Sequence, residues 1–158
     1  METLATSSLQ VRPVKPEDLS VISEIEEASF KDPFPPYFIA QLADANPNTF
    51  LVALDKGTIV GYAVVDDWTD QHHLVSIAVL ANHRRRGVGH ALLNALIGRL
   101  SQGKLGLELR KSNKNALSLY MKNGFSQTGV AHSYYTDGED AIQMEKTIEK
   151  KIPIAATA

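Results

Sequence analysis

The sequence contains no cysteine. This absence excludes a disulfide framework, a thiol nucleophile and zinc sites built on thiolates. Long hydrophobic runs are missing too, since none approaches the roughly 18 apolar residues of a membrane-spanning helix. The opening METLATSSLQ has no basic region followed by an apolar one, so we expect no targeting leader and a cytoplasmic location. The formal net charge of -2 gives no global basic field, and we expect neither nucleic acid nor a membrane as a partner.

The length and composition are those of one globular domain. With 158 residues, 44% of them apolar and 22% charged, the chain can bury one substantial core. We expect a folded domain over residues 9–147, preceded by a flexible segment at 1–8 and followed by a tail at 148–158.

Hydrophobic periodicity and turn residues predict how strands and helices follow one another. Strands are expected at 9–14, 49–54, 58–68, 72–80, 104–110, 125–134 and 139–147. Helices are expected at 16–30, 37–44, 87–102 and 113–124. The prolines of KDPFPPYF predict a fixed, partly extended loop between the first two helices. This order combines antiparallel hairpins with one strand–helix–strand crossover, and it predicts an α/β fold with an α+β mixed sheet.

The stretch HRRRGVGH (83–90) lies between a predicted strand and a predicted helix. Its glycines allow a tight turn and the close approach of a ligand. Free N–H groups at the start of a helix favour an anion, and three arginines add donors and charge. The stretch lacks the Gly-Lys-Ser/Thr of a phosphate loop and the three glycines of a dinucleotide fingerprint. By itself it fits a phosphate-binding turn and a solvated basic turn about equally well.

Longer segments around this turn carry a family resemblance. SIAVLANHRRRGVGHALL, LELRKSNKNALSLYMKNGF and YYTDGEDAIQM together resemble the GNAT N-acetyltransferases, in the branch of RimI and the archaeal Ard-type protein N-terminal acetyltransferases. The resemblance covers about residues 9–147. It implies a GNAT fold with splayed central strands and helices on both faces, acetyl-CoA as the acetyl donor, no metal, and direct transfer in a ternary complex.

The resemblance also implies which residues bind acetyl-CoA. The turn is expected to grip its pyrophosphate, while Asn113 contacts the pantetheine in addition to its ordinary role as a helix N-cap. The expected cofactor-binding residues are Ile77, Ala78, Val79, Arg84, Arg85, Arg86, Gly87, Val88, Gly89, His90, Asn113, Tyr120, Met121 and Lys122.

Three residues are candidates for the chemistry. Glu108 interrupts the leucines of LGLELR on a strand expected to be covered on both faces, although a solvent-facing glutamate paired with Arg110 is the alternative. His73 has a pKa suited to accepting a proton, or it is a polar strand-end residue. Tyr120 is either a packed helix residue or a phenol able to donate a proton to a thiolate. The resemblance makes Glu108 and His73 candidate bases that share an ordered water, and it places Tyr120 beside the sulfur.

Two distant aromatic segments are expected to hold the acceptor. The expected substrate-binding residues are Asp32, Phe34, Pro35, Tyr37, Glu108, Tyr134 and Tyr135, with Tyr135 bonding the peptide backbone. Each aromatic residue also fits simple packing beneath its loop. The assignment of Asp32 depends on archaeal relatives, because bacterial relatives have a different loop there.

The predicted function is acetylation of the α-amine at protein or peptide N-termini, with ribosomal proteins among the candidate substrates. A peptide α-amine with a pKa near 8 is about a tenth neutral at pH 7, against a few in ten thousand for a lysine side chain, so a modest base is enough. Two alternatives stay open: a small-amine acetyltransferase of the same fold, and a catalytically silent acyl-CoA-binding regulatory module. An auxiliary subunit is compatible with the resemblance but not implied by it.

Overall fold

A computed structural model describes residues 8–68 and 71–149. Within these ranges, seven strands form one mixed sheet in the order β1-β2-β3-β4-β5-β7-β6. The strands are β1 (Leu9–Pro13), β2 (Phe50–Asp55), β3 (Thr58–Asp67), β4 (Gln71–Val79), β5 (Gly103–Arg110), β6 (Ser126–Ala131) and β7 (Ala141–Ile148). The helices are α2 (Leu19–Ser29), α3 (Pro36–Ala45), α4 (Val88–Arg99) and α5 (Lys114–Lys122), with short 3-10 turns at η1 (Pro16–Asp18) and η2 (Ala81–His83). The expected α/β fold with a mixed sheet is confirmed.

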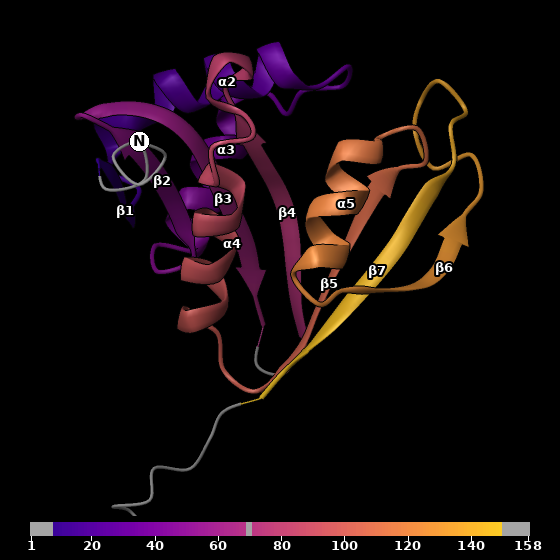
Figure 1. The fold of residues 1–158 in the computed structure, drawn as a ribbon. Coiled ribbons are helices and arrows are strands. Elements are labelled where there is room, and N and C mark those ends of the chain that lie inside the picture. The colour runs from indigo at the N-terminus through magenta and orange to yellow at the C-terminus, as the bar shows by residue number, and fades with distance from the viewer. Residues whose placement is uncertain (1–7, 69–70, 150–158) are drawn as a thin grey trace, which may run out of the picture.

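The sheet opens in its middle, between β4 and β5 (Figure 1). These two strands are parallel, and their pairing runs from Gln71↔Lys104 to His73↔Gly106. Beyond that point β4 continues beside β3 and β5 continues beside β7. The two halves of the sheet therefore diverge as a V, which confirms the expected splaying of the central strands.

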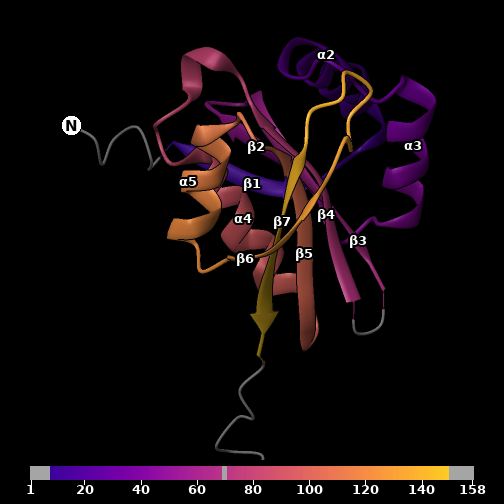
Figure 2. The same cartoon turned by 90° about the vertical axis from the view of Figure 1, so that its right-hand side faces the viewer.

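Helices cover both faces of the sheet, each over its own apolar core. Figure 2 places α4 and α5 on one side of the sheet and α2 and α3 on the other. The core under α4 and α5 includes Leu92 and the alternating residues Leu105, Leu107 and Leu109 of β5. The core under α2 and α3 includes Ile22 and side chains of β2, β3 and β4. The period-two pattern of LGLELR therefore directs its leucines inward, as predicted.

The second face of β5 differs from the expectation. We expected helices over both faces of this strand, but α2 and α3 pack over β2, β3 and β4 instead. The Glu108 side chain on this face is consequently 24% exposed. Glu108 therefore borders an opening in the molecule instead of lying in a core.

Several element boundaries differ from the sequence prediction, among them those of the first helix and of β6. The first helix begins with the 3-10 turn Pro16–Asp18, and β6 ends at Ala131 instead of residue 134. The chain leaves β6 because Ser133 has a φ of 51° and the Tyr135 N–H bonds to the Glu139 carbonyl at 3.2 Å. Residues 132–140 consequently form a folded β6–β7 loop. Among residues 8–68 and 71–149, no helix is long and apolar enough to cross a membrane. The predictions for residues 1–7 and 150–158 lie outside the described residues.

Candidate active site

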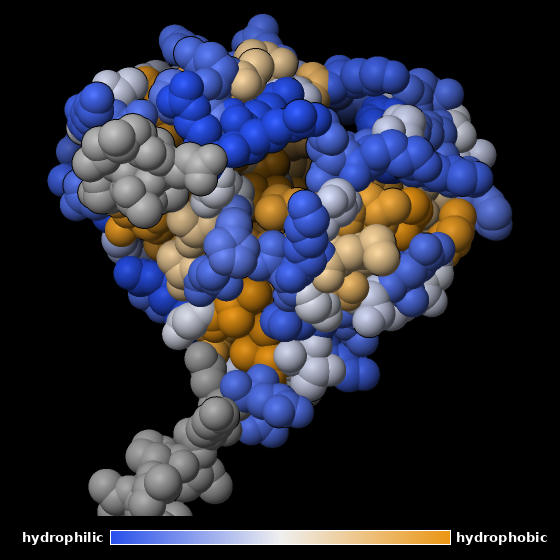
Figure 3. Space-filling model, viewed as in Figure 1, coloured by the Kyte–Doolittle hydropathy of each residue, from blue (hydrophilic) through white to orange (hydrophobic). Residues whose placement is uncertain are grey.

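A cleft of about 1210 Å³ occupies the opening between β4 and β5. Figure 3 shows hydrophobic surface between α4 and α5, with hydrophilic side chains above it. The cleft runs from the turn before α4, along β4 and past β5, to the α2–α3 loop (residues 30–35). Its lining includes the predicted residues Asp32, Phe34, Ile77, Ala78, Val79, Arg84, Arg85, Gly87, Val88, Gly89, His90, Glu108, Asn113, Tyr120, Lys122 and Tyr135. One cavity thus joins most of the residues predicted to bind the donor to those predicted to bind the acceptor.

Six predicted residues do not line this cleft: His73, Tyr134, Pro35, Tyr37, Arg86 and Met121. His73 and Tyr134 still contact a residue that does, because both interact with Glu108. The other four are exposed to solvent outside the cleft. Tyr37 and Met121 are 69% and 61% exposed, since each lies on the outer side of its helix.

The turn before α4 has the backbone shape that its glycines predict. Gly87 is the N-cap of α4 with a φ of 81°, a left-handed conformation that favours glycine. A Cβ atom on Gly89 would lie 3.3 Å from Leu119 Cδ2, so this glycine allows α4 and α5 to pack closely. The Arg84 Nε atom donates to the Val79 carbonyl at 3.0 Å, which fixes the side chain beside the turn. Free N–H groups of the first turn of α4 and the exposed guanidinium of Arg85 favour an anion at this end of the cleft.

The middle of the cleft is bordered by β4 on one side and α5 on the other. Because the pairing of β4 with β5 ends at His73, the backbone of residues 74–79 can bond to a ligand on that side. Across the cleft, Asn113 Oδ1 accepts the N–H of Ala116 at 3.1 Å, so the predicted N-cap of α5 is confirmed.

Tyr120 lies on the cleft side of α5 and is 5% exposed. Its ring packs edge-on against Phe125, with centroids 5.6 Å apart. Burial, with a contribution from nearby Tyr135, raises the pKa of Tyr120. The phenol therefore keeps its proton at neutral pH and acts as a hydrogen-bond donor.

Glu108 and His73 are in direct contact. His73 Nε2 lies 2.7 Å from Glu108 Oε1. Since an ionised carboxylate only accepts, this contact places a proton on Nε2 and leaves Nδ1 as the acceptor nitrogen of the neutral ring. The hydrogen bond with Glu108 raises the pKa of His73, although partial burial lowers it. The ring can therefore take up a proton on Nδ1 and be held as imidazolium beside the Glu108 carboxylate.

Two tyrosines of the β6–β7 loop flank this pair. Burial, the charge of Glu108 and a hydrogen bond with Glu108 all raise the pKa of Tyr134. The Tyr134 and Tyr135 rings meet edge-on with centroids 5.0 Å apart. Burial and the neighbouring Tyr134 raise the pKa of Tyr135 to about 12. Both phenols are neutral donors next to the carboxylate.

The α2–α3 loop is held from below by Glu26, which sequence reasoning missed. The Phe34 N–H donates to Glu26 Oε2 at 3.0 Å, and the Phe34 ring packs against Phe38. Glu26 is 2% exposed and also accepts from Ser76 Oγ at 3.1 Å and from the Tyr62 hydroxyl. The available signal was an acidic residue within the apolar stripe of α2. Phe34 therefore packs beneath its own loop, which was the alternative to substrate binding, and it also lines the cleft.

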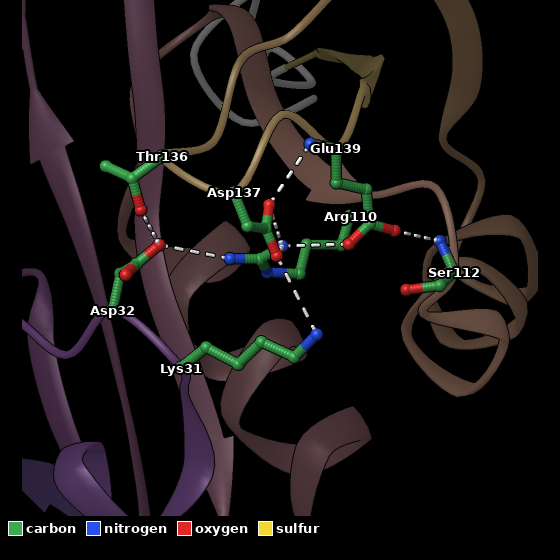
Figure 4. Close-up of polar contacts among 7 residues, drawn as sticks. All are labelled: Lys31, Asp32, Arg110, Ser112, Thr136, Asp137 and Glu139. Atoms are coloured by element: carbon green, nitrogen blue, oxygen red, sulfur yellow. Dashed lines mark hydrogen bonds and ion pairs between the residues drawn. The ribbon is translucent and has the colours of Figure 1, made fainter.

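Arg110 does not pair with Glu108, although such a pair was the alternative role of Glu108 that the sequence left open. Figure 4 shows that it binds other carboxylates: Asp32 Oδ2 at 3.1 Å, Asp137 Oδ2 at 2.9 Å and Glu139 Oε1 at 2.8 Å. Asp32, expected to contact the substrate, does line the cleft, but one of its oxygens is taken up by Arg110. The sequence contains both acidic segments, yet nothing in it indicates that they share one arginine.

Comparison with known proteins identifies the family. The model of the Acetyltransferase (GNAT) family matches residues 19–125. An uncharacterized N-acetyltransferase of Methanocaldococcus jannaschii is 36% identical over 141 residues, which are 86% of this chain and 90% of the relative. The N-alpha-acetyltransferase of Sulfurisphaera tokodaii is 33% identical over 151 residues, or 85% of this chain and 90% of the relative. The crystal structure of Ard1 from Thermoplasma volcanium has a TM-score of 0.85 at 26% identity, and it covers 90% of this chain and 99% of that one. The resemblance seen in the sequence is confirmed, and the chain belongs to the GNAT family of acetyltransferases.

Proposed function

We propose that the protein is an N-alpha-acetyltransferase, which moves the acetyl group of acetyl-CoA to the α-amine of a protein or peptide N-terminus in a ternary complex. The observation that carries the proposal is the contact of His73 with Glu108, which lines the cleft between an anion-binding turn and two aromatic loops. The activity named for the Sulfurisphaera tokodaii relative supports it. Ribosomal proteins are among the candidate substrates.

The residues that line the cleft suit the successive parts of acetyl-CoA. The pyrophosphate is assigned to the turn, where the glycines keep the backbone accessible and Arg84 and Arg85 add positive charge. The amides of the pantetheine can bond to the unpaired edge of β4 at residues 74–79. This direction brings the thioester between Tyr120 on α5 and Glu108 on β5.

The chemistry is a direct displacement at the thioester carbonyl. The amine nitrogen forms a bond to the carbonyl carbon, the C–S bond breaks, and the amine releases one proton. The His73–Glu108 pair takes up that proton, with Nδ1 of the histidine as the free acceptor. Full proton transfer from Tyr120 to a thiolate is uphill because burial raises its pKa. We therefore assign Tyr120 a hydrogen bond that stabilises the departing thiolate, which solvent then protonates.

An α-amine suits this site better than a lysine side chain does. The difference between the two pKa values makes the neutral lysine amine rarer, at a cost of about 3 kcal/mol. A histidine is a modest base, and the hydrogen bond with Glu108 raises the pKa of His73. A modest base is sufficient for the amine that is already partly neutral.

The two alternatives are not favoured. A small free amine would make no use of aromatic residues contributed by two loops, Phe34 on one and Tyr135 on the other. A silent acyl-CoA-binding module would need no histidine in contact with the Glu108 carboxylate of the cleft. The enzyme hypothesis accounts for both features.

The deciding experiment supplies acetyl-CoA and a library of short peptides, and locates the acetyl group by mass spectrometry. We expect acetylation at the α-amine. The matched control is the same peptides with a blocked N-terminus and one internal lysine, which we expect to react far more slowly. Equal rates on free and blocked peptides would overturn the proposal.

The proposal places the reaction in the cytoplasm, where acetyl-CoA and protein N-termini are both available. An auxiliary subunit is compatible with this proposal but is not implied by it.

A further inference from the structure

Three chain segments meet at one guanidinium beside the acceptor end of the cleft (Figure 4). Asp32 belongs to the α2–α3 loop, Arg110 ends β5, and Thr136 and Asp137 belong to the β6–β7 loop. The Asp32 Oδ2 atom accepts from Arg110 Nη2 at 3.1 Å and from Thr136 Oγ1 at 2.9 Å. Lys31 adds an ion pair with Asp137 at 3.8 Å. We call Asp32, Arg110, Thr136, Asp137 and Glu139 the latch, because they join the two loops side chain to side chain.

The charge of the latch depends on Arg110. Three carboxylates (Asp32, Asp137 and Glu139) share two cations (Arg110 and Lys31). A guanidinium can serve several carboxylates at once because its five N–H donors are fixed in a plane, whereas an ammonium group is a point charge. Without Arg110 the three carboxylates would face one another with one peripheral lysine, and their repulsion would drive the loops apart.

The latch is partly solvated, so salt weakens it. The Arg110 side chain is 16% exposed, but Asp32 and Asp137 are 48% and 43% exposed. Ion pairs of this kind are screened by dissolved ions and are individually weak. The contacts of the latch should therefore weaken as ionic strength rises.

The latch is connected to the reacting end of the cleft through aromatic rings. The Arg110 guanidinium lies over the Tyr135 ring, 4.1 Å from its centroid. Tyr135 packs edge-on against Tyr134, and Tyr134 interacts with Glu108. Opening the latch would therefore displace the tyrosines beside the candidate base without touching the anion-binding turn.

We propose that Arg110 is a positioning residue for the acceptor: it latches the α2–α3 loop to the β6–β7 loop and thereby holds the walls between which the peptide N-terminus binds. The inference rests on the proposed function, because it concerns the acceptor of that same reaction. It predicts an effect on peptide binding that leaves acetyl-CoA binding unchanged.

The test compares steady-state kinetics of the wild type with Arg110→Met, Arg110→Lys and Asp32→Asn, with one α-amine peptide as acceptor. We expect the peptide KM to rise about tenfold in Arg110→Met and less in Arg110→Lys, while kcat changes by less than about threefold and the KM for acetyl-CoA stays constant. Raising sodium chloride from about 0.05 M to about 0.5 M should raise the peptide KM of the wild type, and should do so much less in Arg110→Met. The matched control is Arg99→Met, since Arg99 is an exposed arginine bonded to Asn48 away from the cleft.

Each outcome either supports or overturns the positioning role of Arg110. A rise in peptide KM with loss of its salt dependence supports the positioning role, and an unchanged peptide KM in a folded Arg110→Met overturns it. If Arg110→Met does not fold, Asp32→Asn removes one arm of the latch and is judged by the same two readouts. Hydrogen exchange of the 132–140 amides tests the latch without any turnover, and unchanged protection in Arg110→Met overturns it. A wild type that acetylates no peptide overturns the proposed function and the positioning role, whereas faster exchange in Arg110→Met would still support the loop contact itself.

Discussion

Replacing Glu108 by glutamine tests the contact on which the proposed chemistry depends. The carboxylate raises the pKa of His73, and burial opposes it, so removing the negative charge must lower that pKa. Because His73 is 45% and Glu108 24% exposed, we give the pair the value of a solvent-screened ion pair, about 0.5–1 kcal/mol.

The assay is the pH titration of the histidine ring protons by NMR. His73→Gln identifies the His73 signal among the five histidines of the chain. The matched control is Glu145→Gln, because Glu145 pairs with Lys104 at 3.6 Å on the same sheet, with no contact to His73. A His73 pKa that is the same in the wild type and in Glu108→Gln would refute the direct contact.

The same variants connect the titration to the rate. We expect Glu108→Gln and His73→Ala each to lower kcat by about 10- to 100-fold. Because the two groups touch and hold one proton together, the double variant should lose more than either single variant but less than the product of the two losses. Wild-type rates for both single variants would move the base elsewhere, and Asp32 would be the next carboxylate to examine.

Three further predictions concern other parts of the molecule. Gly89→Glu should weaken acetyl-CoA binding at least tenfold by calorimetry in a folded protein, because its side chain would meet Leu119 and bring a negative charge to the turn; an unchanged affinity would remove the turn from the donor site. Tyr120→Phe should lower kcat by about tenfold, without a change of pH profile, through loss of the hydrogen bond to the thiolate, and wild-type kcat would contradict this role. Asp18→Asn should lower the free energy of unfolding by about 1.5–3 kcal/mol at neutral pH, because the Asp18 carboxylate accepts from Arg12 at 2.7 Å and 3.1 Å. Since the pKa of Asp18 is lowered in the fold, chiefly by Arg12, this stabilisation is present above about pH 4 and is lost as the pH falls through the folded pKa; a pH-independent difference in denaturant titrations would contradict it.

The parts of the site that lie in regular structure could be predicted from local patterns. The alternation around Glu108 fixes which face of β5 it occupies, and the asparagine at residue 113 caps α5 because of its side-chain chemistry. The glycine at residue 87 indicates a left-handed turn for the same local reason. In these cases the interaction joins residues within one or two turns of chain.

The parts that the sequence did not reveal depend on contacts between distant segments. Glu26 reaches Ser76, fifty positions away, and Arg110 reaches Asp32, seventy-eight positions away. Periodicity cannot predict either contact, because many other acidic and basic residues of the sequence have the same local pattern around them. The exposure of Glu108 was misjudged for a similar reason: which strands α2 and α3 cover is decided by the packing of the whole domain.

The short seam between β4 and β5 also decides how the domain deforms. Three residue pairs join these strands, whereas seven join β3 to β4 and eight join β5 to β7. Bending at the seam is therefore the soft direction of an otherwise stiff sheet, since the angle of the V can change while the ladders of both halves stay intact. A ligand that forms hydrogen bonds with the free edge of β4 adds contacts where β4 and β5 are not paired. Binding should therefore make the domain stiffer against bending between these two strands.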